Sequence, residues 1–185
     1  KFCRHFHLSL QSGCAKTLKE MNRRYTPEEY RNAVNTVRKY MPDAGLTTDI
    51  IAGFPGESEE DFEESYNFAK EIGFLKIHAF PYSPKKGTAA AGRKDQLHNN
   101  VKSERTKALI ELSDRTGLEF ISSFVGKNMD VLFERRHNGG LWEGYTSNYI
   151  KVHVKSDDNL ENEIKTVRIT KAMAEQAEGE IVISC

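Results

Sequence analysis

Three short stretches of the sequence combine small and polar residues at the points where apolar runs end. They are Gln11-Ser12-Gly13, Gly53-Phe54-Pro55-Gly56-Glu57 and Pro81-Tyr82-Ser83-Pro84. In parallel α/β proteins, ligands bind at the carboxyl ends of the strands. Glycines allow a ligand to approach the backbone, and amides that open a following helix favour an anionic group. We therefore expect a small-molecule site where the three stretches converge. Taken singly, each stretch is better explained as an ordinary strand-to-helix turn, and only the three together indicate a site.

Two further features indicate a ligand with a polar end. Asp49 interrupts the apolar run 46–54, where a carboxylate is costly unless it is paired or ligand-bound. It could accept hydrogen bonds from ribose hydroxyls of a ligand or from the adjacent threonine side chains. Arg23 and Arg24 precede a helix start and could grip a carboxylate or phosphate with paired hydrogen bonds, or form a solvated basic turn. The residues alone leave the reaction open.

The residues that usually perform covalent or metal chemistry are sparse. Cys3, Cys14 and Cys185 are odd in number and widely spaced, which favours neither a disulfide framework nor a zinc site. Nucleophile elbows, phosphate loops and paired general acids and bases are not recognisable. Nothing near the strand histidines completes a metal set, so we predict no metal-ligating and no catalytic side chain; these histidines are His5, His7 and His78.

A second candidate surface lies near the C-terminus, where aromatic, amide and basic residues surround one turn. Such a layout suits stacking on RNA bases. Residues 123–185 carry 8 Lys/Arg and 10 Asp/Glu, a net charge of −2, so RNA binding there would depend on a local patch. The alternative is a structural cluster that fills a small barrel. The residues predicted to bind RNA are Trp142, Tyr145, Asn148, Tyr149 and Lys151.

The first part of the chain alternates strands and helices. Thr26 with Glu29, and Ser58 with Asp61, have the spacing of helix-starting capping boxes, and Gly73 fits a helix end. Alternation of this kind predicts a parallel α/β sheet or barrel, with the strand 46–54 covered on both faces. The expected strands are 5–10, 46–54 and 74–82, and the expected helices are 16–22, 26–41 and 58–72.

The pattern changes after a loop or lid over 83–96. A long helix is expected over 100–120, and five short strands then predict a small antiparallel barrel. We place a domain boundary near Ser123. The predicted division is a parallel α/β domain over 1–98, a linker helix over 99–122 and the small barrel over 123–185.

Length and composition narrow the class of protein further. The 185 residues hold 27 basic and 27 acidic side chains, so no global field points to a nucleic acid or a membrane as partner. No run of about 18 apolar residues and no signal peptide occurs. We therefore expect a cytoplasmic protein without a membrane partner.

Four motifs in order strongly resemble the MiaB-type radical S-adenosylmethionine methylthiotransferases that modify tRNA. They read HLSLQSG, MNRRYTPEEY, TTDIIAGFPGESEEDF and IHAFPYSPKKGT. The first motif, which has Ser9, is similar to the motif of the MtaB-like branch, because the other branches typically have proline at this position. The segment EGYTSNYIKV, residues 143–152, resembles the TRAM domain of these enzymes.

This resemblance implies an activity. Enzymes of the MtaB-like branch methylthiolate C2 of N6-threonylcarbamoyladenosine next to the tRNA anticodon, using S-adenosylmethionine and [4Fe-4S] clusters. The implied partner is the tRNA anticodon stem-loop. There are two alternatives. The substrate could be isopentenyladenosine, or the chain could be a stand-alone RNA-binding adaptor without enzymatic activity.

The resemblance also implies how much of the enzyme is present. The family holds its radical-generating cluster with a Cys-x3-Cys-x2-Cys motif, which these 185 residues lack. The expected architecture is therefore α/β: the C-terminal half of a radical S-adenosylmethionine (TIM-like) barrel, followed by a small antiparallel β-barrel. Alone it should be inactive, and its exposed strand edge predicts a homodimer.

By the same resemblance, the cofactor site is assigned by region. One group of residues would face the methionine part of S-adenosylmethionine: Gln11, Ser12, Gly13, Arg23 and Arg24. A second group would line its ribose and adenine: Asp49, Ile51, Gly53, Phe80, Pro81, Tyr82 and Ser83.

Overall fold

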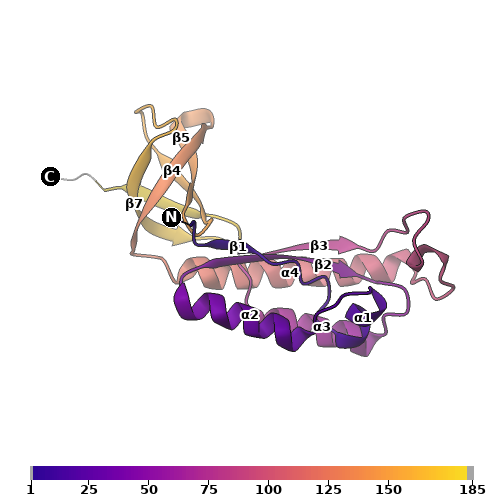
Figure 1. Cartoon of the computed structure of the whole chain (residues 1–185). Coiled ribbons are helices and arrows are strands. Elements are labelled where there is room, and N and C mark those ends of the chain that lie inside the picture. The colour runs from indigo at the N-terminus through magenta and orange to yellow at the C-terminus, as the bar shows by residue number, and fades with distance from the viewer. Residues whose placement is uncertain (1, 183–185) are drawn as a thin grey trace.

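The computed structural model describes residues 2–182 and places a three-stranded parallel sheet with helices beside a closed β-barrel (Figure 1). The sheet order is β1-β2-β3, and a single bridge from Gln11 to Ile50 extends the β1 side. The elements of this part are β1 (His5–His7), α1 (Ala15–Glu20), α2 (Pro27–Tyr40), β2 (Gly45–Ala52), α3 (Glu59–Ile72), β3 (Lys76–Pro81) and α4 (Asn99–Ser122), with a 3-10 turn at Ala90–Gly92.

Local sequence signals set the helix ends. Thr26 and Glu29 form a full capping box at the start of α2, and Ser58 and Asp61 form one at the start of α3. Gly73 ends α3 with a φ of 64°, a left-handed conformation that suits glycine. These boundaries agree with the sequence-based expectation.

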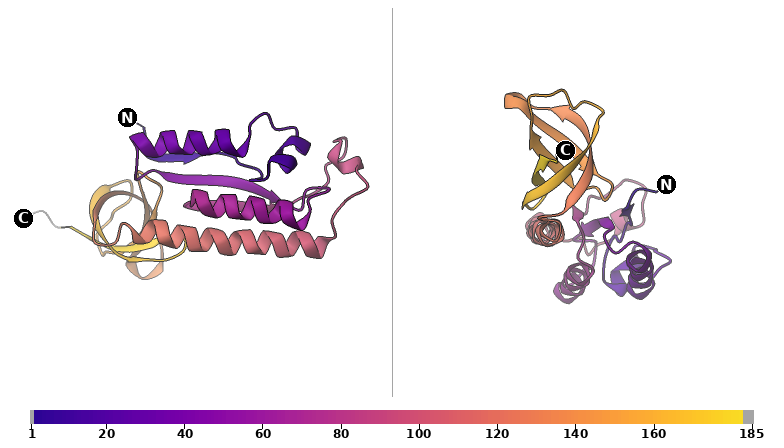
Figure 2. Two further views of the ribbon diagram at one scale, coloured as in Figure 1. Left: turned by 90° about the horizontal axis from the view of Figure 1, so that it is seen from below. Right: turned by 90° about the vertical axis from the view of Figure 1, so that its left-hand side faces the viewer.

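The helices cover one face of the sheet (Figures 1 and 2). Apolar side chains of the strands pack against them, among them Leu46, Ile50 and Ile77. The expectation that the second strand is covered on both faces was wrong, because Asp49 and Ile51 are only half-buried on the opposite face. That face instead carries polar residues.

The second part of the chain is a closed five-stranded barrel in the order β4-β5-β6-β8-β7. All pairs are antiparallel except β6 with β8, which is parallel, so the purely antiparallel barrel expected from the sequence needs this correction. The chain forms β7 after β6, and β8 then lies between β6 and β7. The strands are β4 (Asn128–Arg136), β5 (Leu141–Thr146), β6 (Lys151–Lys155), β7 (Ile164–Ala172) and β8 (Ala177–Ile181), with a 3-10 turn at Asn138–Gly140.

The barrel is docked on the amino end of the parallel sheet. The turn between β5 and β6 carries Asn148, whose side-chain amide donates to the carbonyl oxygen of Asp43 at 3.0 Å. The amide of Arg4 donates to the carbonyl oxygen of Ser147 at 2.8 Å. Gly45 is required by this approach, since a Cβ there would lie 2.2 Å from the carbonyl oxygen of Asn148.

Two expectations about partners concern the fold as a whole. Within residues 2–182 no helix is long and apolar enough to cross a membrane. Nothing in the structure supports the pairing of two copies through the sheet edge, so the homodimer stays a prediction.

Candidate functional site

The uncovered face of the sheet presents a row of polar and aromatic side chains. Strand register pairs Asp49 with His78 and Ile51 with Phe80, and His7 lies on the neighbouring strand. Because side chains alternate between the faces of a strand, these residues all point away from the helices. We call this surface, formed by His7, Asp49, Ile51, His78 and Phe80, the open face.

At the carboxyl ends of the strands, the open face runs into a hollow of about 260 Å³. We call it the strand-end pocket. Of the twelve residues predicted to bind the cofactor, the structure brings seven together here. The lining consists of Gln11, Asp49, Ile51, Phe80, Pro81, Tyr82 and Ser83.

Gln11 stands at the mouth of this pocket in an unusual backbone conformation. Its φ is 66°, in the left-handed region that non-glycine residues adopt at a cost. Two backbone hydrogen bonds hold it there: its amide donates to the carbonyl oxygen of Asp49 at 2.8 Å, and its carbonyl oxygen accepts from the amide of Ile51 at 3.0 Å. The conformation is therefore imposed by the sheet.

Asp49 does not use the neighbouring threonines. Its Oδ2 lies 3.2 Å from Nε2 of His7 and accepts from the hydroxyl of Ser9 at 3.2 Å. Thr48 turns its hydroxyl to the carbonyl oxygen of Leu8, at 2.6 Å. The alternative in which the threonines satisfy Asp49 is thus wrong. In the described part of the chain, all hydrogen bonds of this carboxylate use Oδ2, which leaves Oδ1 for a ligand.

Three small predicted residues serve packing in this structure. Ser12 is buried, and the amide of Gly13 donates to the hydroxyl of Ser65 on α3 at 2.8 Å. A Cβ on Gly13 would lie 2.7 Å from Cβ of Phe68, and one on Gly53 would lie 2.5 Å from Cγ of Lys102. These glycines let the turns approach the helices closely, so a ligand is not needed to explain them.

The arginine pair lies outside the strand-end pocket. Arg23 and Arg24 are exposed in the turn between α1 and α2, and neither forms an ion pair within residues 2–182. The structure therefore leaves the solvated-turn interpretation in place.

A buried ion pair stabilises the loop that follows β2, and the sequence analysis did not predict it. Arg105 on α4 donates to Oε1 of Glu57 at 2.6 Å, and the same carboxylate accepts from the amide of Gly53 at 3.0 Å. Burial raises the pKa of the Glu57 carboxyl, and the hydrogen bond with Arg105 opposes that shift. The partners are 48 residues apart, so no local motif signals the pair.

At the other end of the open face, a cleft of about 430 Å³ separates the sheet from the barrel. The ring of Tyr149 stacks on His5 with centroids 4.3 Å apart and on Tyr145 at 5.0 Å. Lys151 and His78 also line this junction cleft. Tyr149 is 53% exposed, so its ring borders solvent as well.

The other two members of the predicted RNA-binding cluster are buried. Trp142 is 2% exposed inside the barrel, where its indole donates to the carbonyl oxygen of Asp158 at 3.1 Å. Asn148 is 0% exposed and ties the barrel to the sheet. Neither side chain can contact RNA in this structure, which corrects the prediction for both. Tyr145, Tyr149 and Lys151 remain at the cleft.

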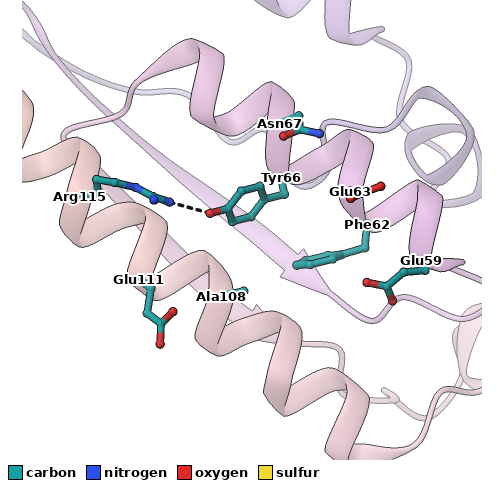
Figure 3. A pocket seen from close by; sticks show the side chains of 8 residues that line it. All are labelled: Glu59, Phe62, Glu63, Tyr66, Asn67, Ala108, Glu111 and Arg115. Atoms are coloured by element: carbon teal, nitrogen blue, oxygen red, sulfur yellow. Dashed lines mark hydrogen bonds between the residues drawn. The ribbon is translucent and has the colours of Figure 1, made fainter.

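A further hollow of about 450 Å³ lies between α3 and α4 on the helical side (Figure 3). Figure 3 shows Arg115 donating to the hydroxyl of Tyr66, at 2.6 Å, while Glu59, Glu63 and Glu111 surround the groove. Three carboxylates disfavour phosphate or RNA by charge repulsion. The groove is therefore a poor binding site for a nucleic acid.

Comparison with known proteins gives the chain two family matches. Residues 1–69 match the radical SAM superfamily, and residues 122–182 match the TRAM domain. A threonylcarbamoyladenosine tRNA methylthiotransferase MtaB from Bacillus subtilis (strain 168) is 40% identical over 98% of this chain and 41% of its own length. A tRNA-2-methylthio-N(6)-dimethylallyladenosine synthase from Thermoanaerobacter sp. (strain X514) is also 40% identical, over 98% and 39%. The chain thus spans about two fifths of the length of these relatives.

Proposed function

We propose that this chain, whose residues 1–69 match the radical SAM superfamily and whose residues 122–182 match the TRAM domain, supplies the S-adenosylmethionine-binding and tRNA-binding surfaces of a tRNA methylthiotransferase. The modified base is the adenosine next to the anticodon, and the anticodon stem-loop is the macromolecular partner.

The continuity of the open face carries this proposal. Asp49 lines the strand-end pocket, and His7, which is hydrogen-bonded to it, lines the junction cleft. A small molecule in the pocket and a nucleotide entering from the cleft would therefore meet on the same side of the sheet. Within residues 2–182, the two hollows on the helical side, of about 450 and 640 Å³, are each lined by three glutamates, so neither offers a comparable surface to a nucleic acid.

The strand-end pocket fits the adenosine part of S-adenosylmethionine. Oδ1 of Asp49 is available to accept from a ribose hydroxyl, and Ile51 with Phe80 offers an apolar surface to an adenine ring. The side chain of Gln11 brings an amide to the rim. When bound, the cofactor would supply a deoxyadenosyl radical and a methyl group, and this chain's residues would bind it and orient it.

The thiols in the described part of the chain do not fit a [4Fe-4S] cluster. Cys3 is exposed, while Cys14 is buried and directs its Sγ at Asp61. Cys185 lies outside the described residues. A cluster needs several convergent thiolates, so no step of the reaction is assigned to these side chains.

N6-threonylcarbamoyladenosine is the substrate that we favour. Ser9, in the motif that resembles the MtaB-like branch, lies on the open face and donates to Asp49. Lys76 and Lys151 line the junction cleft and would pair with a substrate carboxylate by exchanging their present partners, Glu175 and Glu143. The second candidate is the dimethylallyl-bearing adenosine, because relatives named for each activity are 40% identical to this chain.

Nucleoside analysis tests the proposal directly. Transfer RNA from cells in which the gene is disrupted should lack 2-methylthio-N6-threonylcarbamoyladenosine and accumulate its unthiolated precursor. Loss of the 2-methylthio dimethylallyl nucleoside instead would select the second substrate. If both nucleosides persist, the methylthiotransferase assignment fails.

Complementation sharpens this test. The gene carrying Asp49→Asn should restore the nucleoside poorly, because the amide cannot replace a carboxylate as acceptor for both Ser9 and a ribose. The matched variant Asp157→Asn, at an exposed position of the barrel, should restore it fully. Equal restoration by both variants would remove Asp49 from the cofactor site.

A further inference from the structure

The outer face of the barrel gathers two imidazoles and a carboxylate from three adjacent strands or strand ends. Glu143 on β5 is directly paired with His153 on β6. His137 follows the end of β4, and its amide donates to the carbonyl oxygen of Leu141 at 2.7 Å. The three side chains lie on a hydrogen-bonded framework that fixes their backbone positions.

The donor atoms are spaced for a metal ion. Oε2 of Glu143 lies 3.3 Å from Nε2 of His137 and 3.3 Å from Nε2 of His153. With Zn–N and Zn–O bonds of about 2.0–2.2 Å, two ligands of a tetrahedral Zn²⁺ are about 3.3–3.5 Å apart. The three ligand atoms all lie within 4.8 Å of one another, so only the two imidazoles need a modest approach. His137 is the most exposed of the three, which leaves its ring room to move.

We propose that His137, Glu143 and His153 form a binding site for a divalent transition-metal ion, with Zn²⁺ as the expected occupant. Two imidazoles and one carboxylate are a donor set typical of Zn²⁺, and the fourth position faces solvent. No short sequence motif announces the site, because its ligands are separated by 6 and 10 residues and meet only across the strands.

The ion would also change the neighbourhood of a residue at the junction cleft. Nζ of Lys151 lies 3.8 Å from the same Oε2 of Glu143. A metal ion on that oxygen would repel the ammonium group and turn Lys151 away from Glu143. The site therefore adjoins the RNA-facing surface proposed above without depending on that function.

The competing explanation is a hydrogen-bonded cluster in which each imidazole donates its Nε2 proton to Glu143. Glu143→Gln separates the two, because the amide oxygen still accepts hydrogen bonds but is a far weaker metal ligand. The measurement is a titration of the full chain with Zn²⁺ against a chromophoric chelator, in a background with Cys3 and Cys185 changed to serine. His98→Ala is the matched control, since His98 is exposed and lies at the start of α4.

We expect one tightly bound Zn²⁺ per chain in the background that lacks Cys3 and Cys185, and also after His98→Ala. Glu143→Gln and His153→Ala should each weaken binding roughly a hundredfold, since loss of even an outer-shell partner costs about 10–100-fold. The thermal midpoint should rise with Zn²⁺ only in the chains that retain all three ligands. Zinc affinity that is unchanged by Glu143→Gln, or no saturable binding by the starting protein, would overturn the proposal.

Discussion

The side-chain amide of Asn148 donates to the main-chain carbonyl oxygen of Asp43 at 3.0 Å, across 105 residues of sequence. Its own oxygen accepts a hydrogen bond from the hydroxyl of Thr146. The first hydrogen bond joins the barrel to the amino end of the sheet, and the second, which is buried within the barrel, fixes the orientation of the Asn148 amide. This docking is what places the junction cleft on the same face as the strand-end pocket.

Replacing Asn148 with alanine should lower the free energy of unfolding by about 1–3 kcal/mol, because a buried carbonyl and a buried hydroxyl lose their partner. Chemical denaturation measures the change. Asn32→Ala, at an exposed position of α2, should stay within about 0.5 kcal/mol of the parent. Equal effects of the two substitutions would contradict the docking role of Asn148.

Two glutamates of the β2–α3 region pair with Arg105, and their unequal burial predicts that their substitutions lower the free energy of unfolding by unequal amounts. Glu57→Ala removes the buried partner, leaves Arg105 only the exposed carboxylate of Glu59, and should cost about 3–5 kcal/mol. Glu59→Ala removes a partner of the same guanidinium that is 73% exposed and should cost about 0–1 kcal/mol. Urea unfolding measures both variants. Equal losses of unfolding free energy would contradict the stabilising role of the buried Glu57–Arg105 pair.

Tyr30 predicts a loss of stability in alkali. Its hydroxyl donates to the carbonyl oxygen of Leu8 at 2.7 Å, and burial raises the pKa of Tyr30 to about 12. Because the folded-state pKa lies above the unfolded value of about 10, the contribution is complete below pH 10 and is lost as pH rises through about 12. The loss amounts to at most about 2.7 kcal/mol.

Tyr30→Phe isolates this contribution. The stability difference between the parent and the variant should shrink by about 2 kcal/mol from pH 9 to pH 12, since only the parent carries the titrating hydroxyl at this position. Unfolding curves at the two pH values measure it. A difference that does not change with pH would show that Tyr30 ionises equally well in both states.

The junction cleft predicts that one exposed tyrosine contributes to RNA binding. Tyr149→Ala should weaken the affinity for an anticodon stem-loop by about 1–3 kcal/mol, the usual contribution of one stacked base. Tyr40→Ala removes a tyrosine that is 73% exposed on α2 and should leave the affinity unchanged. Fluorescence anisotropy with labelled RNA measures both affinities. Equal affinities of the two variants would contradict RNA binding at the junction cleft.

Sequence reasoning succeeded where the signal is local. Each capping box joins residues three positions apart, so the starts of α2 and α3 are encoded within one turn of chain. The convergence of strand ends also followed from topology, which is why Gln11, Asp49 and Phe80 lie in one pocket. These features need no knowledge of tertiary contacts.

It failed where the outcome depends on which way a side chain points. Trp142 and Tyr145 are close in sequence, yet Trp142 lies inside the barrel and Tyr145 lines the cleft. Gly13 and Gly53 were read as ligand contacts, whereas the helices that pack on them, α3 and α4, account for them. Long-range pairs such as His7 with Asp49 leave no mark in either segment alone.

Methyl NMR of the full chain tests the central claim, that cofactor and RNA share the open face. Ile51 lines the strand-end pocket, whereas Ile110 is exposed on α4, the helix that covers the other face. We expect S-adenosylhomocysteine to shift the Ile51 methyl signals, and an anticodon stem-loop to shift ring signals of Tyr145 and Tyr149, with Ile110 unmoved by either. Shifts at Ile110, with Ile51 unaffected, would contradict the account.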